Sequence, residues 1–120
     1  VDANPEVTYA GLLQLAELKG VAWVHAIRMA STGIDSLALT RAHYSGALIG
    51  SDSYTAEEAD TSIGNGLVDA VSFGRLYIAN PDLVERFKRG GPFNEMDKRT
   101  IYGGEGAAGY CDYPMLSGGA

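Results

Sequence analysis

Apolar positions along the chain follow two different spacings, one typical of helices and one typical of buried strands. Helical spacing or a helix start signal is present in four stretches, at residues 5–19, 34–44, 55–64 and 81–89. Mostly apolar runs between them predict three strands, at residues 21–28, 47–50 and 67–73. The predicted order is therefore helix, strand, helix, strand, helix, strand, helix.

Local signals mark where the predicted helices begin and end. Asn4-Pro5 and Asn80-Pro81 each place an N-cap residue before a proline at the first helical position. Thr55 and Glu58 have the spacing of a capping box, and the glycine-containing turn at residues 64–66 ends the same helix.

Strands that are apolar nearly throughout and alternate with helices predict an α/β fold with a parallel sheet built from βα units. Three strands are few for such a fold. A (β/α)8 barrel takes roughly 250 residues, so a chain of 120 residues corresponds to about half of one. We expect residues 1–89 to form the βα units of a partial barrel. The glycine-rich residues 90–120 lack periodicity and are expected to be a loop-like tail of the same domain.

Charge and cysteine content narrow the class of protein. The formal net charge is −6, and the nine Lys and Arg residues are scattered, which argues against a nucleic-acid surface. We interpret Arg86, Lys88 and Arg89 as a solvated helix end, where cations complement the helix dipole. No apolar run approaches the ~20 residues of a membrane span. The single Cys111 has no disulfide partner, so a reducing, cytoplasmic location is expected. Val1 begins the sequence in what resembles the middle of a loop, which suggests a piece of a longer chain.

Small and charged residues follow two of the predicted strands. Ser51-Asp52-Ser53 follows the second strand, and Gly74-Arg75 follows the third. Ligands of parallel α/β folds bind at the carboxyl ends of the strands. Small residues let backbone N–H groups approach a ligand, and a guanidinium is a bidentate anion donor, so this pattern fits a phosphate site. On these residues alone, a turn at Gly74 with a carboxylate partner for Arg75 is the favoured interpretation, and the phosphate site is the alternative.

Other chemical patterns are interpreted as structural. The GEGAAG stretch at residues 104–109 has the spacing of a dinucleotide fingerprint but lacks the preceding strand and following helix. His25 and His43 have no ligand partners at metal spacing, so no metal site is predicted. Glu57-Glu58 lies at a helix start, where the helix dipole favours carboxylates.

Five short motifs occur in order in the second half of the chain: FGR, IANPDL, YGG, GY and DYP. Over about residues 46–116, and more loosely over 4–25, the sequence resembles the C-terminal end of the Old Yellow Enzyme family of FMN-dependent ene-reductases. The resemblance implies a (β/α)8 TIM barrel of which this chain is the C-terminal part, about strands six to eight with their helices. Strands one to five would lie outside it.

The resemblance assigns the FMN phosphate to residues at the strand ends. The backbone of Gly74 and the side chain of Arg75 would hold the phosphate, and Asp52 and Ser53 would add backbone donors. Related sequences usually have glycine at the position of Asp52, so a carboxylate lies where the family has none.

The resemblance also places two residues of the YGG region near the reaction. Tyr102 would line the substrate pocket and Ile101 would lie near the flavin, at a position where relatives usually carry an aromatic residue. The connection between His25 and Gly50 is short for the family and lacks its usual acidic and aromatic residues. No catalytic residue is expected within this segment.

The function that the resemblance implies is that of an FMN-dependent oxidoreductase. NADPH or NADH would reduce FMN, and the reduced flavin would reduce the activated C=C bond of an enone or related small-molecule acceptor. The expected partners are the remaining barrel strands or another copy of the chain, with no nucleic acid and no membrane. An alternative is a catalytically inactive half-barrel that acts as a structural or binding module.

Overall fold

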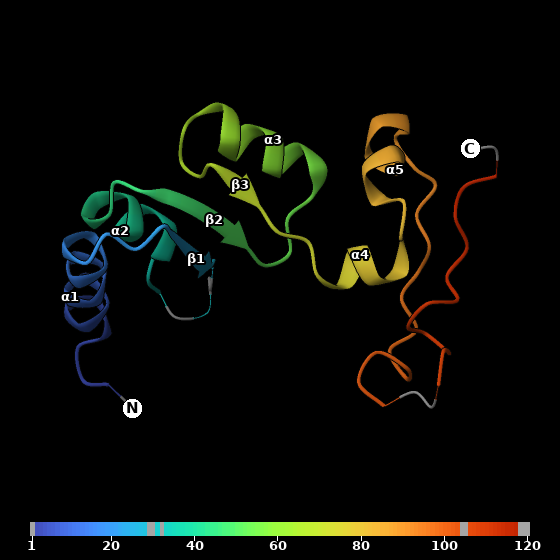
Figure 1. Ribbon diagram of the computed structural model, residues 1–120, viewed down its shortest axis with the longest axis horizontal. Coiled ribbons are helices and arrows are strands. Elements are labelled where there is room, and N and C mark those ends of the chain that lie inside the picture. The colour runs from blue at the N-terminus through green and yellow to red at the C-terminus, as the bar shows by residue number, and fades with distance from the viewer. Residues whose placement is uncertain (1, 29–30, 32, 104–105, 118–120) are drawn as a thin grey trace. The chain divides into compact units, whose positions relative to one another are not determined.

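The computed structural model describes residues 2–28, 31, 33–103 and 106–117 (Figure 1). The chain forms two compact units, Val1–Ser72 and Phe73–Ala120. The first unit contains the sheet, and the second contains two short helices and the C-terminal tail.

The first unit has the predicted alternation of helices and strands. Its elements in chain order are α1 (Pro5–Leu18), β1 (Trp23–Ile27), α2 (Ser36–His43), β2 (Ala47–Ser51), α3 (Ala56–Gly64) and β3 (Ala70–Val71). The strands form one parallel sheet in the order β1-β2-β3, which confirms the α/β prediction. Helix α1 packs against α2, α2 packs against β1 and β2, and α3 packs against β3 (Figure 1).

Strand β1 lies at an edge of the sheet and is more exposed than predicted. Trp23, His25 and Ile27 share one face of the strand, and all three are exposed. Trp23 is 59% exposed and Ile27 53%, whereas Ala26 on the other face is buried. The prediction of a buried strand at residues 21–28 is therefore wrong for the face of β1 that carries Trp23, His25 and Ile27.

Strand β3 is shorter than the predicted strand at residues 67–73. Only Ala70–Val71 forms a ladder with β2. Just before it, a carboxylate oxygen of Asp69 accepts the backbone N–H of Leu48 at 2.8 Å, a bond that a backbone carbonyl would otherwise accept in a longer ladder. A side chain thus replaces the backbone partner at this point.

In the first unit, helix starts follow the sequence signals with one exception. The capping box is present, because Glu58 N–H donates to the Thr55 hydroxyl and Thr55 N–H donates to the Glu58 carboxylate. Asn4 lies at the N-cap of α1, but its side chain makes no capping bond. The capping carboxylate of α2 belongs to Asp35, which accepts the N–H of Ala38.

The second unit contains a helix that was not predicted. Residues Arg75–Ala79 form α4, and α5 spans Leu83–Arg89 rather than beginning at Pro81. The prediction of Asn80 as an N-cap is wrong, because its buried side-chain amide donates back to the Leu76 carbonyl at 2.9 Å and thereby closes the C-terminus of α4.

Arg86 corrects the interpretation of the helix end as solvated. It is 2% exposed, and its guanidinium binds the Asp82 carboxylate at 2.6 Å and the carbonyls of Pro92 and Pro114 at 2.6 and 2.7 Å. Lys88, in contrast, is exposed as expected. The described part of the tail has no helix or strand, as predicted, and Arg86 ties two of its segments to α5.

Candidate functional site

The loop after β2 has an unusual backbone conformation. Asp52 has a φ of 85° and Ser53 a φ of 54°, so two consecutive non-glycine residues lie in the left-handed region. This conformation costs roughly 1–2 kcal/mol for a residue with a Cβ atom, which explains why glycine suits the position of Asp52. Successive N–H groups in such turns form concave sites that bind anions. The loop is therefore an anion-binding candidate on the basis of its backbone alone.

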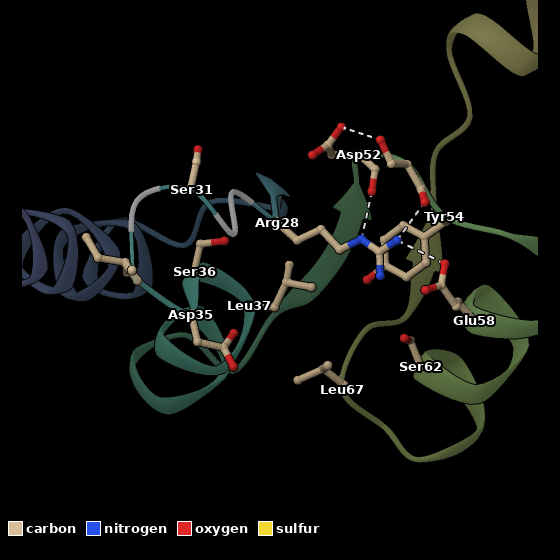
Figure 2. A pocket seen from close by; sticks show the side chains of 13 residues that line it. Arg28, Ser31, Asp35, Ser36, Leu37, Asp52, Tyr54, Glu58, Ser62 and Leu67 are labelled. Atoms are coloured by element: carbon tan, nitrogen blue, oxygen red, sulfur yellow. Dashed lines mark hydrogen bonds and ion pairs between the residues drawn. The ribbon is translucent and has the colours of Figure 1, made fainter.

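Arg28, at the carboxyl end of β1, holds this loop from the neighbouring strand (Figure 2). Its Nε donates to the Asp52 carbonyl at 2.7 Å, and its Nη2 donates to the Ser53 carbonyl at 2.7 Å. The guanidinium carbon lies 3.8 Å from the ring centroid of buried Tyr54, within the range of a cation–π contact. Arg28 thus fixes the loop through hydrogen bonds to two consecutive carbonyls.

Two carboxylates lie beside the loop. Glu58 accepts a hydrogen bond from Arg28 Nη2 at 3.0 Å, and its pKa is lowered by the Thr55 N–H and then by Arg28. The Asp52 carboxylate accepts a hydrogen bond from the Ser53 hydroxyl at 3.0 Å. The positive charge of Arg28 is opposed by these two carboxylates, so the side-chain charges around the loop do not by themselves favour an anion. The attraction of the loop for an anion therefore depends largely on its backbone N–H dipoles.

A hollow of about 860 Å³ opens beside Arg28. It lies within the first unit and is lined from the start of α2, the loop after β2 and α3. Ser36, Leu37, Tyr54, Glu58 and Ser62 are among the lining residues labelled in Figure 2. The wall combines hydroxyl, carboxylate and apolar groups and carries no pair of histidine and carboxylate for acid–base chemistry.

Gly74 and Arg75 lie in the second unit. Gly74 is the N-cap residue of α4, and its carbonyl accepts the N–H groups of Tyr77 and Ile78 at 3.0 Å. Arg75 is the first helical residue rather than the last residue of a strand, and both residues are exposed. A Cβ atom at Gly74 would meet no heavy atom within 4 Å, so the space beside this backbone is open.

Ile101 and Tyr102 lie in turns of the tail. Ile101 is half-buried, and Tyr102 is 92% exposed, so its ring is available to a ligand or to further protein. Gly104 of the GEGAAG stretch lies outside the described residues. Residues 106–111 form turns, and residues 112–117 contain no helix.

His25 and Cys111, which the sequence analysis did not assign to a site, lie in surroundings without metal-binding partners among the described residues. His25 shares a hydrogen bond of 2.8 Å with the Ser72 hydroxyl, and Cys111 is an exposed free thiol. Within the described ranges, no group of three or more His, Cys, Asp or Glu residues could hold a metal ion. In the same ranges, no helix has both the length and the apolar character needed to cross a membrane.

Sequence reasoning did not single out Arg28. The signal was present, because a lone cation ends a strand whose parallel neighbour ends in small residues. Its partners are backbone carbonyls 24 and 25 residues away, however, and no residue type in the sequence marks a carbonyl as a partner.

Comparison with known proteins places these features in a family. No family model matches the chain. It is 33% identical over 115 residues to a 12-oxophytodienoate reductase-like protein of Solanum lycopersicum, a match that covers 96% of this chain and 32% of that protein. The old yellow enzyme from Trypanosoma cruzi matches with a TM-score of 0.87 and 43% identity, over 96% of this chain and 31% of that one. Morphinone reductase, solved in complex with tetrahydroNAD, matches with a TM-score of 0.88 and 36% identity, over 98% and 32% of the two chains.

The first unit consists of parallel βα units with an anion-binding candidate loop at the carboxyl end of a strand. Together with the structural matches, this arrangement defines the fold as part of a (β/α)8 barrel. The chain belongs to the Old Yellow Enzyme family, as a segment that spans about a third of the length of the relatives it matches.

Proposed function

We propose that the polypeptide carrying this segment is an FMN-dependent NAD(P)H oxidoreductase that reduces the activated C=C bonds of enones and related small molecules. The observation that carries the proposal is the similarity of nearly the whole chain to the Trypanosoma cruzi old yellow enzyme, at 43% identity. The names of the other relatives, a 12-oxophytodienoate reductase-like protein and a morphinone reductase, are consistent with reduction of such acceptors.

Within that enzyme, this segment corresponds to about strands six to eight and supplies the FMN phosphate site. The donors are the backbone of Asp52 and Ser53 after β2, the backbone of Gly74, and the guanidinium of Arg75. The left-handed loop after β2 supports this assignment because successive N–H groups in such turns bind anions, and the open space beside Gly74 leaves its backbone accessible.

The chemistry of the reaction depends on groups beyond this segment. FMN, held at its phosphate by the donors named above, would supply hydride transfer from NADPH or NADH to the acceptor. In this segment, the residues proposed to face the reaction are Ile101, which would lie near the flavin, and Tyr102, whose exposed ring would line the substrate pocket. The residues that bind and protonate the acceptor belong to other barrel strands.

The exposed face of β1 is covered by those remaining strands. Trp23 and Ile27 are apolar, more than half exposed and on the same face of the strand, with His25 between them. The matched relatives are about three times as long as this segment, so they contain the chain needed to cover it. Sedimentation of the isolated 120-residue chain should show self-association. A monodisperse monomer with a cooperative thermal transition would contradict this assignment.

Flavin content and turnover test the proposed activity. Denaturing the purified full polypeptide should release one FMN per chain. Anaerobic NADPH or NADH oxidation should then depend on an added enone such as 2-cyclohexenone. A polypeptide that neither contains nor binds FMN would refute the proposal, and FMN binding without enone-dependent turnover would refute the acceptor class.

An inactive structural or binding module remains the second candidate, and one observation favours it. The Asp52 carboxylate lies in the proposed phosphate loop, and like charges about 4 Å apart repel by roughly 1 kcal/mol in water and about 4 kcal/mol at an effective dielectric of 20. The two candidates differ in FMN affinity, since only the enzyme requires binding of the dianion.

A further inference from the structure

We infer that Arg28 is the positioning residue of the phosphate loop: its guanidinium sets the direction of the Ser53 N–H, one of the backbone donors proposed for the FMN phosphate, and of the Tyr54 N–H beside it. The inference rests on the proposed function and adds to it a residue that does not itself touch the cofactor.

The argument begins with the geometry of the peptide unit. A trans peptide is planar, so its C=O and N–H groups point in opposite directions. The carbonyl of Asp52 belongs to the same peptide unit as the N–H of Ser53, and the carbonyl of Ser53 to the same unit as the N–H of Tyr54. Arg28 binds both carbonyls at 2.7 Å and therefore turns both N–H groups away from itself.

Two contacts fix the guanidinium in turn. Glu58 accepts from Nη2 at 3.0 Å, and the Tyr54 ring lies 3.8 Å from the guanidinium carbon. Glu58 is held by the capping box at the start of α3. The orientation of Arg28 is therefore fixed by a helix through Glu58, and not by a side chain that rotates freely. Two neighbouring strands and a helix thereby determine one loop conformation.

The loop needs such a support because its own residues disfavour the conformation. Asp52 and Ser53 both carry a Cβ atom at positive φ, where only glycine lies without strain. A planar guanidinium that donates to two consecutive carbonyls compensates for the absence of glycine. A lysine in place of Arg28 retains the charge but cannot bind two carbonyls in a fixed plane.

The chain provides a matched control in Arg41. Its guanidinium also binds two carbonyls and one carboxylate, those of Leu67, Gly46 and Asp69. The side-chain exposures are 29% for Arg41 and 32% for Arg28. Arg41 acts at the amino ends of β2 and β3, so its loss resembles that of Arg28 in stability but leaves the loop after β2 unchanged.

The test compares FMN with riboflavin, which lacks the phosphate, in the full polypeptide and its R28Q, R28K and R41Q variants. In R28Q, we expect the Kd for FMN to rise about tenfold or more and the Kd for riboflavin to change less than twofold. R28K should lose FMN affinity to a similar extent, and R41Q should leave the ratio of the two Kd values unchanged. Thermal melting reports any variant that fails to fold, and R28K serves if R28Q does not fold.

Three results would overturn the inference: an unchanged FMN affinity in R28Q, an equal weakening of both flavins, or full FMN affinity in R28K. A wild-type protein that does not prefer FMN to riboflavin would instead refute the proposed function. In that case, amide NMR shifts decide the positioning role on their own. The positioning role is supported if the amide resonances of Ser53 and Tyr54 shift in R28Q but not in R41Q. It is overturned if these resonances do not shift in R28Q.

Discussion

Replacement of Arg86 by methionine should detach the C-terminal tail from α5. Methionine has a similar length but no donor, so the Pro92 and Pro114 carbonyls and the Asp82 carboxylate would all lose their buried partner. The tail would lose one hydrogen bond at each of two segments at once, because a single guanidinium binds carbonyls 22 residues apart. The bonds of Asn94 to Asn80 and of Leu116 to Asp82 would then hold the tail less firmly.

The magnitude follows from the number and burial of these bonds. Each charge-assisted hydrogen bond contributes about 1.5–3 kcal/mol, and removal of one partner from a buried ion pair costs roughly 3–5 kcal/mol. We therefore expect a loss of about 3–5 kcal/mol in the free energy that holds the tail closed. Opening of the tail limits the effect on the first unit, which has its own core.

Native-state hydrogen exchange measures this loss directly. The N–H groups of Asn94, Asp97 and Leu116 donate to side chains of Asn80, Tyr113 and Asp82, so their protection reports tail closure. In R86M their exchange should accelerate by at least a hundredfold. Lys88→Met is the control, since this exposed cation pairs only across one helical turn and should leave the rates unchanged. A loss below about 1 kcal/mol with Leu116 still protected would refute this account of the tail.

Three further changes test other parts of the fold. Gly46→Ala should destabilise the first unit by at least about 2 kcal/mol in urea unfolding, because the new Cβ would overlap the ring of buried Tyr44, whose hydroxyl donates to Val21. Asp52→Gly should stabilise it by about 0.5–1 kcal/mol in the same assay by removing left-handed strain. The Arg99 guanidinium lowers the pKa of Asp97 to about 2, so this ion pair should stabilise the tail above about pH 4 and be lost as the pH falls toward 2, which tail fluorescence or circular dichroism would record.

Each of these changes has a control that separates the proposed cause from a general effect. Gly64→Ala adds a Cβ in open space at the end of α3 and should be nearly neutral. Asp52→Ala removes the charge but keeps a Cβ at positive φ, so it should bring no gain in stability. Asp97→Asn should abolish the acid-dependent step, and its persistence would assign the step to another carboxylate.

The order of elements in the first unit followed from the sequence because its signals are local. Apolar runs, the capping box at Thr55 and Glu58, and the turn after α3 each act within a few residues. Burial did not follow in the same way. The apolar content of β1 predicted a buried strand, but burial depends on what covers the strand, and residues 21–28 do not contain that information.

The second unit shows the same limit for polar groups. Arg86 resembled a solvated cation because three basic residues lie close together in the sequence. Its real partners include backbone carbonyls in the tail. Every residue has a backbone carbonyl, so the sequence does not indicate which of them binds Arg86. Asn80 was misinterpreted for a related reason, since asparagine before proline is an N-cap signal but the amide here serves the preceding helix. The site residues taken from the family resemblance remain predictions.

The loop after β2 can be specified in two chemically different ways. Glycine adopts positive φ by itself, whereas Asp52 and Ser53 are held there through Arg28. The two solutions make the positions interdependent during evolution: with Arg28 present, the glycines are dispensable, and with glycines present, the arginine is free to change. Substitutions at residue 28 should therefore be tolerated or harmful according to the residues at 52 and 53, and the path from one solution to the other should pass through a sequence that has both.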